Sequence, residues 1–80
     1  MNRSKAVVGD MDTYWLHVRK GFIITVEVFK TPKQYKGFAS CNKLGKEDVV
    51  GTAGHANKKE CIQLAIKDLR ENELVERYLS

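Results

Sequence analysis

Lys58 and Lys59 are the residues of this sequence best placed to do chemistry, because two ammonium groups directly follow Asn57, a residue type that caps helices. The dipole of a helix disfavours cations in its first turn, where acidic residues are more usual. Two lysines there are explained if their ammonium groups and the free backbone N–H groups converge on a phosphate. A solvated pair that binds nothing is the alternative. Glu60 beside them weakens the phosphate hypothesis, although helix capping also explains it.

Five more lysines occur between residues 30 and 46, a stretch that contains no acidic residue. They are Lys30, Lys33, Lys36, Lys43 and Lys46. The first three flank one predicted connection and the last two belong to the next. Because successive connections of an antiparallel meander lie at opposite ends of the sheet, the two sets need not form one surface. Lysines on exposed strands also protect sheet edges, which is the other interpretation.

The net charge of +4 is distributed unevenly along the 80 residues. Residues 1–59 hold 11 basic and 5 acidic side chains, whereas residues 60–80 hold 3 basic and 5 acidic ones. The basic part favours an anionic partner, and the acidic C-terminal part could engage a basic one.

Aromatic residues are interleaved with the lysines, as on surfaces that stack the bases of single-stranded nucleic acid. Stacking requires exposed rings, and we expect Phe29 and Phe38 to lie in the core instead. Trp15 alternates with Tyr14 and Leu16, so one of these two sets faces solvent. Burial of Trp15 is the commoner arrangement, whereas an exposed Trp15 would indicate a partner surface.

The cysteine and histidine residues do not support a metal centre or an active site. Cys41, His55 and Cys61 follow one another at intervals of 14 and 6 residues, with His17 upstream, and this matches no usual zinc pattern. Cys61 fits a small residue of a helical core, and a nucleophile paired with His55 lacks any supporting motif. We therefore expect a protein that is not an enzyme and that has no metal and no cofactor.

Length and composition limit the class of protein. Eighty residues allow one hydrophobic core, and a 42% hydrophobic content argues against disorder. No apolar run approaches the roughly 18 residues that span a bilayer, and the first ten residues lack the apolar core of a secretory signal. With only two cysteines, we expect reduced thiols, a cytoplasmic location and no membrane partner.

The hydrophobic pattern predicts an α+β domain over residues 13–80, preceded by a tail or short strand in residues 1–12. Strands are predicted at 13–18, 22–29, 35–42 and 49–52, with short connections that require an antiparallel meander. A helix over about 58–71 should pack on one face of the sheet, in the order β-β-β-α with three or four strands. A continuation or short second helix is predicted at 73–79.

Within these elements, periodicity identifies the core. Residues Ile24, Val26 and Val28 alternate with polar ones and should face the helix, while Phe38 should face away from Ala39 and Cys41. The helix begins after Asn57 and presents an apolar stripe flanked by Cys61. That stripe consists of Ile62, Ala65, Ile66 and Leu69.

Residues 22–70 resemble the double-stranded-RNA-binding domain. The proline-to-phenylalanine spacing in Pro32-Lys33-Gln34-Tyr35-Lys36-Gly37-Phe38 is similar to the family's first loop and second strand. Gly51-Thr52-Ala53-Gly54 resembles its glycine turn, and Asn57-Lys58-Lys59-Glu60-Cys61 resembles the start of its final helix. Ala65 matches an alanine that lets that helix lie close to the sheet.

The resemblance implies a sheet covered by one helix and recognition of RNA backbone by lysines of the loop and of the helix start. Gln34 stands where the family has a loop histidine, and Ile62 where it has a third helical lysine. Residues 14–18 predict a strand in place of the family's first helix. The resemblance therefore does not extend to the minor-groove contact which that helix makes.

Two functions follow. The first is a small module that binds nucleic acid, RNA rather than DNA, through phosphate contacts. The binding residues would be Lys58, Lys59, Lys33, Lys36, Lys30 and Gln34. The alternative is a protein-binding regulator or inhibitor, similar in size and element order to phage- and plasmid-type antitoxins or anti-CRISPR proteins. It would act through an exposed sheet edge that pairs with a partner protein or with a second copy in a homodimer.

Overall fold

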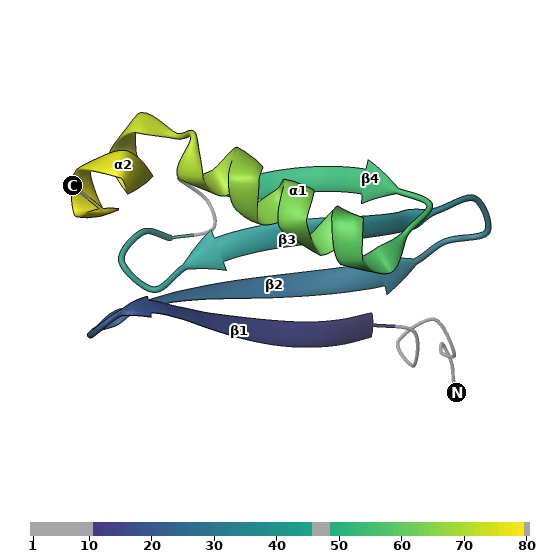
Figure 1. The fold of residues 1–80 in the computed structure, drawn as a ribbon, viewed down its shortest axis with the longest axis horizontal. Coiled ribbons are helices and arrows are strands. Elements are labelled where there is room, and N and C mark those ends of the chain that lie inside the picture. Colours follow the sequence, from purple (N-terminus) through teal and green to yellow (C-terminus); the bar gives the residue numbers. More distant parts are fainter. Residues whose placement is uncertain (1–10, 46–48, 80) are drawn as a thin grey trace.

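In the computed structural model, which describes residues 11–45 and 49–79, four strands precede two helices. The strands form one antiparallel sheet in the order β1-β2-β3-β4, and α1 lies across one face (Figure 1). This confirms the predicted α+β meander and its short second helix. The elements are β1 (Met11–Arg19), β2 (Phe22–Lys30), β3 (Tyr35–Cys41), β4 (Gly51–His55), α1 (Lys58–Arg70) and α2 (Glu73–Leu79). Residues 1–10 of the predicted tail or short strand, and Lys46, lie outside the described residues.

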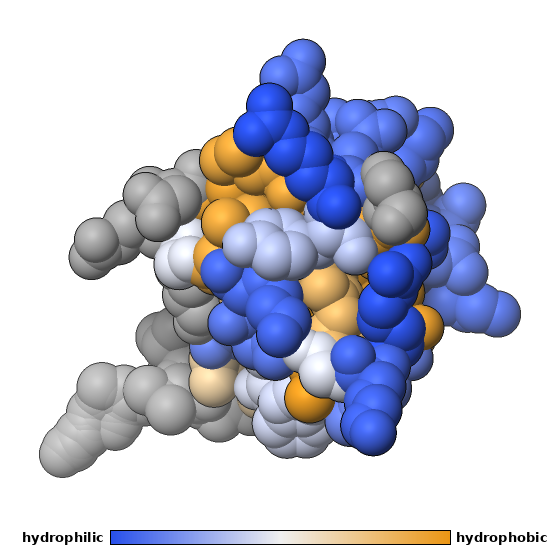
Figure 2. All heavy atoms as spheres, turned by 90° about the vertical axis from the view of Figure 1, so that its left-hand side faces the viewer, coloured by the Kyte–Doolittle hydropathy of each residue, from blue (hydrophilic) through white to orange (hydrophobic). Residues whose placement is uncertain are grey.

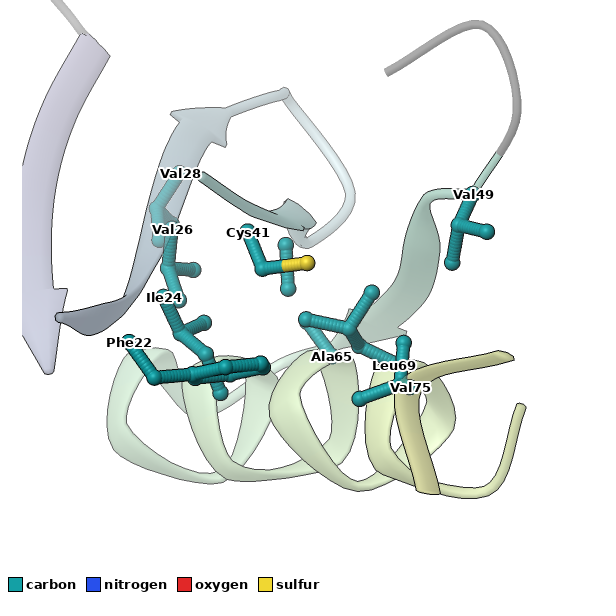
Figure 3. Close-up of a cluster of buried hydrophobic side chains, with 10 residues drawn as sticks. Phe22, Ile24, Val26, Val28, Cys41, Val49, Ala65, Leu69 and Val75 are labelled. Atoms are coloured by element: carbon teal, nitrogen blue, oxygen red, sulfur yellow. The ribbon is translucent and has the colours of Figure 1, made fainter. Parts of the chain in front are cut away.

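Strand β2 supplies one wall of the hydrophobic core. Phe22, Ile24, Val26 and Val28 are buried against α1 (Figure 3), and the last three were predicted to be so from their alternation with Thr25 and Glu27. Full burial of each such side chain contributes roughly 1.5–3 kcal/mol to stability. The turn between β1 and β2 is closed by Gly21, whose φ of +80° lies in the region that glycine adopts most easily.

Helix α1 begins where its cap predicts. The side chain of Asn57 accepts a hydrogen bond of 3.1 Å from the backbone N–H of Glu60. The buried face of the helix consists of Cys61, Ala65 and Leu69. Gly51 lies so close to the helix backbone that a Cβ there would approach Leu69 N to 2.4 Å. The absence of a side chain at this position of β4 therefore lets α1 pack this close to the sheet.

Strand β4 lies later in the chain than predicted. The sequence indicates a strand at 49–52 followed by a glycine turn, whereas the ladder runs from Gly51 to His55. The reason is the register, in which Tyr35 opposes His55 and Ala39 opposes Gly51. Val49 is buried just before the strand begins.

Helix α2 closes the end of the molecule where β1 turns into β2. Val75 is fully buried, and the ring of Tyr78 lies 6.3 Å from that of Phe22. The guanidinium of Arg19 donates a 2.5 Å hydrogen bond to the carbonyl oxygen of Leu79. Figure 2 views this end, where hydrophobic patches are interspersed among hydrophilic side chains. No helix of the described residues has the length and apolar character needed to cross a membrane.

Candidate nucleic-acid interface

Strand register brings two separate groups of lysines to one end of the sheet. Lys30 opposes Tyr35, Tyr35 opposes His55, and α1 starts three residues after His55. The β2–β3 loop and the start of α1 are therefore neighbours (Figure 1). We call this region the lysine end, and it contains Lys30, Lys33, Lys36, Lys58 and Lys59. Lys43 lies at the opposite end, where its Nζ is 3.8 Å from the position of a Cβ built on Gly21.

The β2–β3 loop is held by a network around Thr31. Its backbone N–H donates to the carbonyl of Gln34 over 2.8 Å, and its hydroxyl donates to the same carbonyl over 2.6 Å. The hydroxyl also accepts a 3.0 Å bond from the N–H of Gln34. Pro32 and Lys33 form the exposed tip, and proline fixes its own φ. The Lys33 ammonium therefore extends from a tightly closed turn.

Two shallow hollows adjoin this loop and share Gln34 and Lys36. One, of about 350 Å³, is lined by Thr31, Pro32, Lys33, Gln34 and Lys36. The other, of about 400 Å³, is lined by Gln34, Lys36, Phe38, Thr52, Ala53 and Gly54. The side chain of Gln34 lies over Gly54, since a Cβ on that glycine would be 2.7 Å from its Nε2. Three predicted binding residues thus share one concave surface.

Phe29 and Phe38 do not lie in the core, so that expectation is wrong. Because Val28 and Ala39 point towards α1, their neighbours Phe29 and Phe38 point to the opposite face, which we call the open face of the sheet. The two rings are partly exposed and pack edge to face with centroids 5.8 Å apart. Lys36 stands opposite Phe29 on this face. An aromatic surface therefore adjoins the lysine end.

Lys58 is engaged within the chain. Its ammonium forms an ion pair with Asp12 and lies 5.4 Å from the ring centroid of Tyr14. The hydrogen bond to Asp12 raises the pKa of Lys58 well above the usual lysine value. Asp12 and Tyr14 were not identified from the sequence, because nothing in it indicates that β1 passes beside the start of α1. Lys59, the adjacent lysine, is exposed and has no such contact with any residue that the structure describes.

His55 and Glu60 also form a pair at the lysine end. The His55 Nε2 lies 3.6 Å from a carboxylate oxygen of Glu60, while its Nδ1 accepts a 2.9 Å hydrogen bond from the N–H of Asn57. This arrangement orders the connection from β4 to α1. Next to Glu60 on the helix, Cys61 is fully buried, and burial raises the pKa of its thiol. Among the described residues, no three His, Cys, Asp or Glu side chains gather as metal ligands would.

Trp15 is exposed, contrary to the expectation that it packs. It opposes Thr25 and therefore belongs to the open face, where 65% of its surface is accessible. The reason is that α1 lies on the opposite face of the sheet, so that no helix among the described residues covers the open face, and that β1 is the outermost strand (Figure 1).

Comparisons of this chain with protein-family models, with curated proteins and with solved structures found no match. The geometry and charge of the lysine end are therefore what indicates a function.

Proposed function

We propose that this protein binds nucleic acid, with lysines at one end of the sheet contacting the phosphate backbone. The observation that carries the proposal is the convergence of the β2–β3 loop and the start of α1, which are more than twenty residues apart in sequence. Lysines and helix N-termini are common donors to phosphate oxygens. No acidic partner of Lys33, Lys36 or Lys59 is found within residues 11–45 and 49–79.

The resemblance to the double-stranded-RNA-binding domain supports RNA as the substrate class. That resemblance implies contacts to the RNA backbone from lysines of the loop and of the helix start. Here Gln34 adds an amide donor and acceptor between Lys33 and Lys36. Phe38 adds a partly exposed ring, on which an unpaired base can stack. The proposed surface therefore combines phosphate contacts with one stacking position.

The proposal is tested by fluorescence anisotropy with labelled duplex RNA, single-stranded RNA and duplex DNA at several salt concentrations. We expect binding to RNA that weakens steeply as salt increases, because cation release accompanies each phosphate contact. The variant Lys33→Glu/Lys36→Glu/Lys59→Glu should lose this binding. A matched control, Lys20→Glu/Lys43→Glu/Lys67→Glu, makes the same charge change away from the lysine end. Equal loss in both variants, or no binding by the parent at low salt, would contradict the proposal.

A further inference from the structure

Strand β1 leaves more apolar surface uncovered than any other element of the sheet. Helix α1 packs on β2, β3 and β4, and β1 contributes to the core shown in Figure 3 only the partly buried Val18, which packs against its edge. As a result, both faces of β1 are accessible. Tyr14 and Leu16 on the side of α1 are each 39% exposed, and Trp15 on the open face is 65% exposed. The outer edge of the same strand has no neighbouring strand among the described residues.

The β4 edge of the sheet is protected against pairing with another strand, whereas the β1 edge is not. Strand β4 has five residues, two of which are glycine. The Asp68 side chain of α1 reaches over this edge and accepts a 2.8 Å hydrogen bond from the backbone N–H of Thr52. By contrast, β1 has nine residues, and its segment 13–18 carries no Lys, Arg, Asp or Glu. Long, apolar, uncharged edges are the ones that pair with another strand.

We propose that two copies of this chain associate through β1, antiparallel, to form one continuous eight-stranded sheet. The interaction goes beyond nucleic-acid binding and does not depend on it. A twofold axis normal to the sheet keeps α1 of both copies on the same face. Over Met11–His17, ahead of the register shift between His17 and Arg19, it also pairs residues whose numbers differ by an even amount, because these point to the same face. Trp15 is the middle residue of β1 and marks the position of the axis.

The β1 edge is complementary to itself, and this identifies a second copy of the chain as its partner. With the axis at Trp15, Tyr14 lies opposite Leu16 of the second copy, and Thr13 lies opposite its His17. No like charges face each other. Asp12 near one end of the strand and Arg19 at the other end carry opposite charges, and each also has a partner within the chain, Lys58 for Asp12 and the Leu79 carbonyl for Arg19. Antiparallel pairing sets the acidic end of one copy beside the basic end of the other, whereas parallel pairing would bring like charges together.

The mass in solution tests the dimer. Light scattering should give about twice the chain mass of 9.1 kDa at micromolar concentrations. Thr13→Lys/His17→Lys and Thr13→Glu/His17→Glu place like charges opposite each other at polar positions of β1, so each should become monomeric. Because Thr13 also pairs with Glu27 of β2, circular dichroism verifies that the Glu variant is folded. An equimolar mixture of the two should recover the dimer through Lys–Glu pairs. Leu64→Lys, at an equally exposed apolar site of α1, should remain dimeric.

Several results would overturn the proposal. These are a parent that stays at 9.1 kDa at 200 µM (about 1.8 mg/ml), charge variants that dimerise like the parent, and a mixture that remains monomeric. Disulfide crosslinking provides a test that does not depend on charge. Under oxidising conditions the Trp15→Cys variant should form a crosslinked dimer, because the two thiols would meet at the axis within disulfide distance. Leu64→Cys should not crosslink. If the protein is monomeric and the β1 amides still resist hydrogen exchange, another segment of the same chain pairs with the β1 edge. That result would refute the dimer.

Discussion

Replacing Asp12 by Asn should strengthen nucleic-acid binding. In the structure, the Asp12 carboxylate pairs with the ammonium of Lys58 and so withholds one cation from the lysine end. Asparagine preserves the shape of the side chain but removes its charge. Lys58 then becomes available to a phosphate, next to Lys59. The substitution converts an internal ion pair into one additional contact with the ligand.

The magnitude follows from counterion release. Each phosphate contact changes the slope of log K against log salt by about 0.7 for a single strand and about 0.9 for a duplex. If the added contact contributes nothing to affinity at 1 M salt, this slope gives about a four- to sixfold higher affinity at 0.15 M salt. The slope itself should become steeper by the same 0.7 to 0.9.

The assay is an anisotropy titration of Asp12→Asn with labelled RNA at four or more salt concentrations. Asp68→Asn serves as the control, because it makes the same change in net charge at the β4 edge, where Asp68 accepts from the Thr52 N–H. Circular dichroism verifies that both variants fold. Unchanged or weaker binding by a folded Asp12→Asn variant would show that the Asp12–Lys58 ion pair does not withhold Lys58 from the ligand. An equal gain in Asp68→Asn would instead show a general charge effect.

Three further predictions concern packing and stacking. Gly51→Ala should lower the free energy of unfolding by about 1–3 kcal/mol in urea denaturation, since its Cβ would meet the backbone of α1. Gly54→Ala should lower it less, because the added Cβ meets only the flexible Gln34 side chain. An equal decrease in both variants would contradict the close packing of α1 on Gly51. Leu69→Ala should lower the free energy of unfolding by about 2–5 kcal/mol, because Leu69 is fully buried. Leu64→Ala, at an exposed site, should lower it by less than about 0.5 kcal/mol. A comparable decrease in both variants would show that Leu69 is not a core residue. Phe38→Ala should weaken single-stranded RNA binding by about 1–3 kcal/mol while leaving duplex binding nearly unchanged; no difference between the two substrates would exclude stacking at this position.

The fold could be predicted to the extent that local patterns determine it. Alternation in β2 identified Ile24, Val26 and Val28 as core residues, and Asn57 identified the helix start, because each signal depends on neighbours in the chain. The second helix was likewise indicated by its apolar spacing. The bounds of β4 were missed, because the pairing of Tyr35 with His55 is set by β3.

The surfaces could not be predicted as well, because they depend on which strands α1 covers. A sequence period shows that Trp15 and Leu16 point to opposite faces, but not that both faces of β1 are exposed. Phe38 was correctly placed opposite Ala39, yet only the single helical layer leaves its face uncovered. The pairing of Lys58 with Asp12 joins residues 46 positions apart and has no sequence signal.

The salt dependence of RNA binding by Lys33→Ala/Lys36→Ala/Lys59→Ala tests the role of the lysine end most directly. If each of the three ammonium groups contacts one phosphate, the slope of log K against log salt should become shallower than the parent's by about 2 to 3. A folded triple variant with the slope and affinity of the parent would contradict the account.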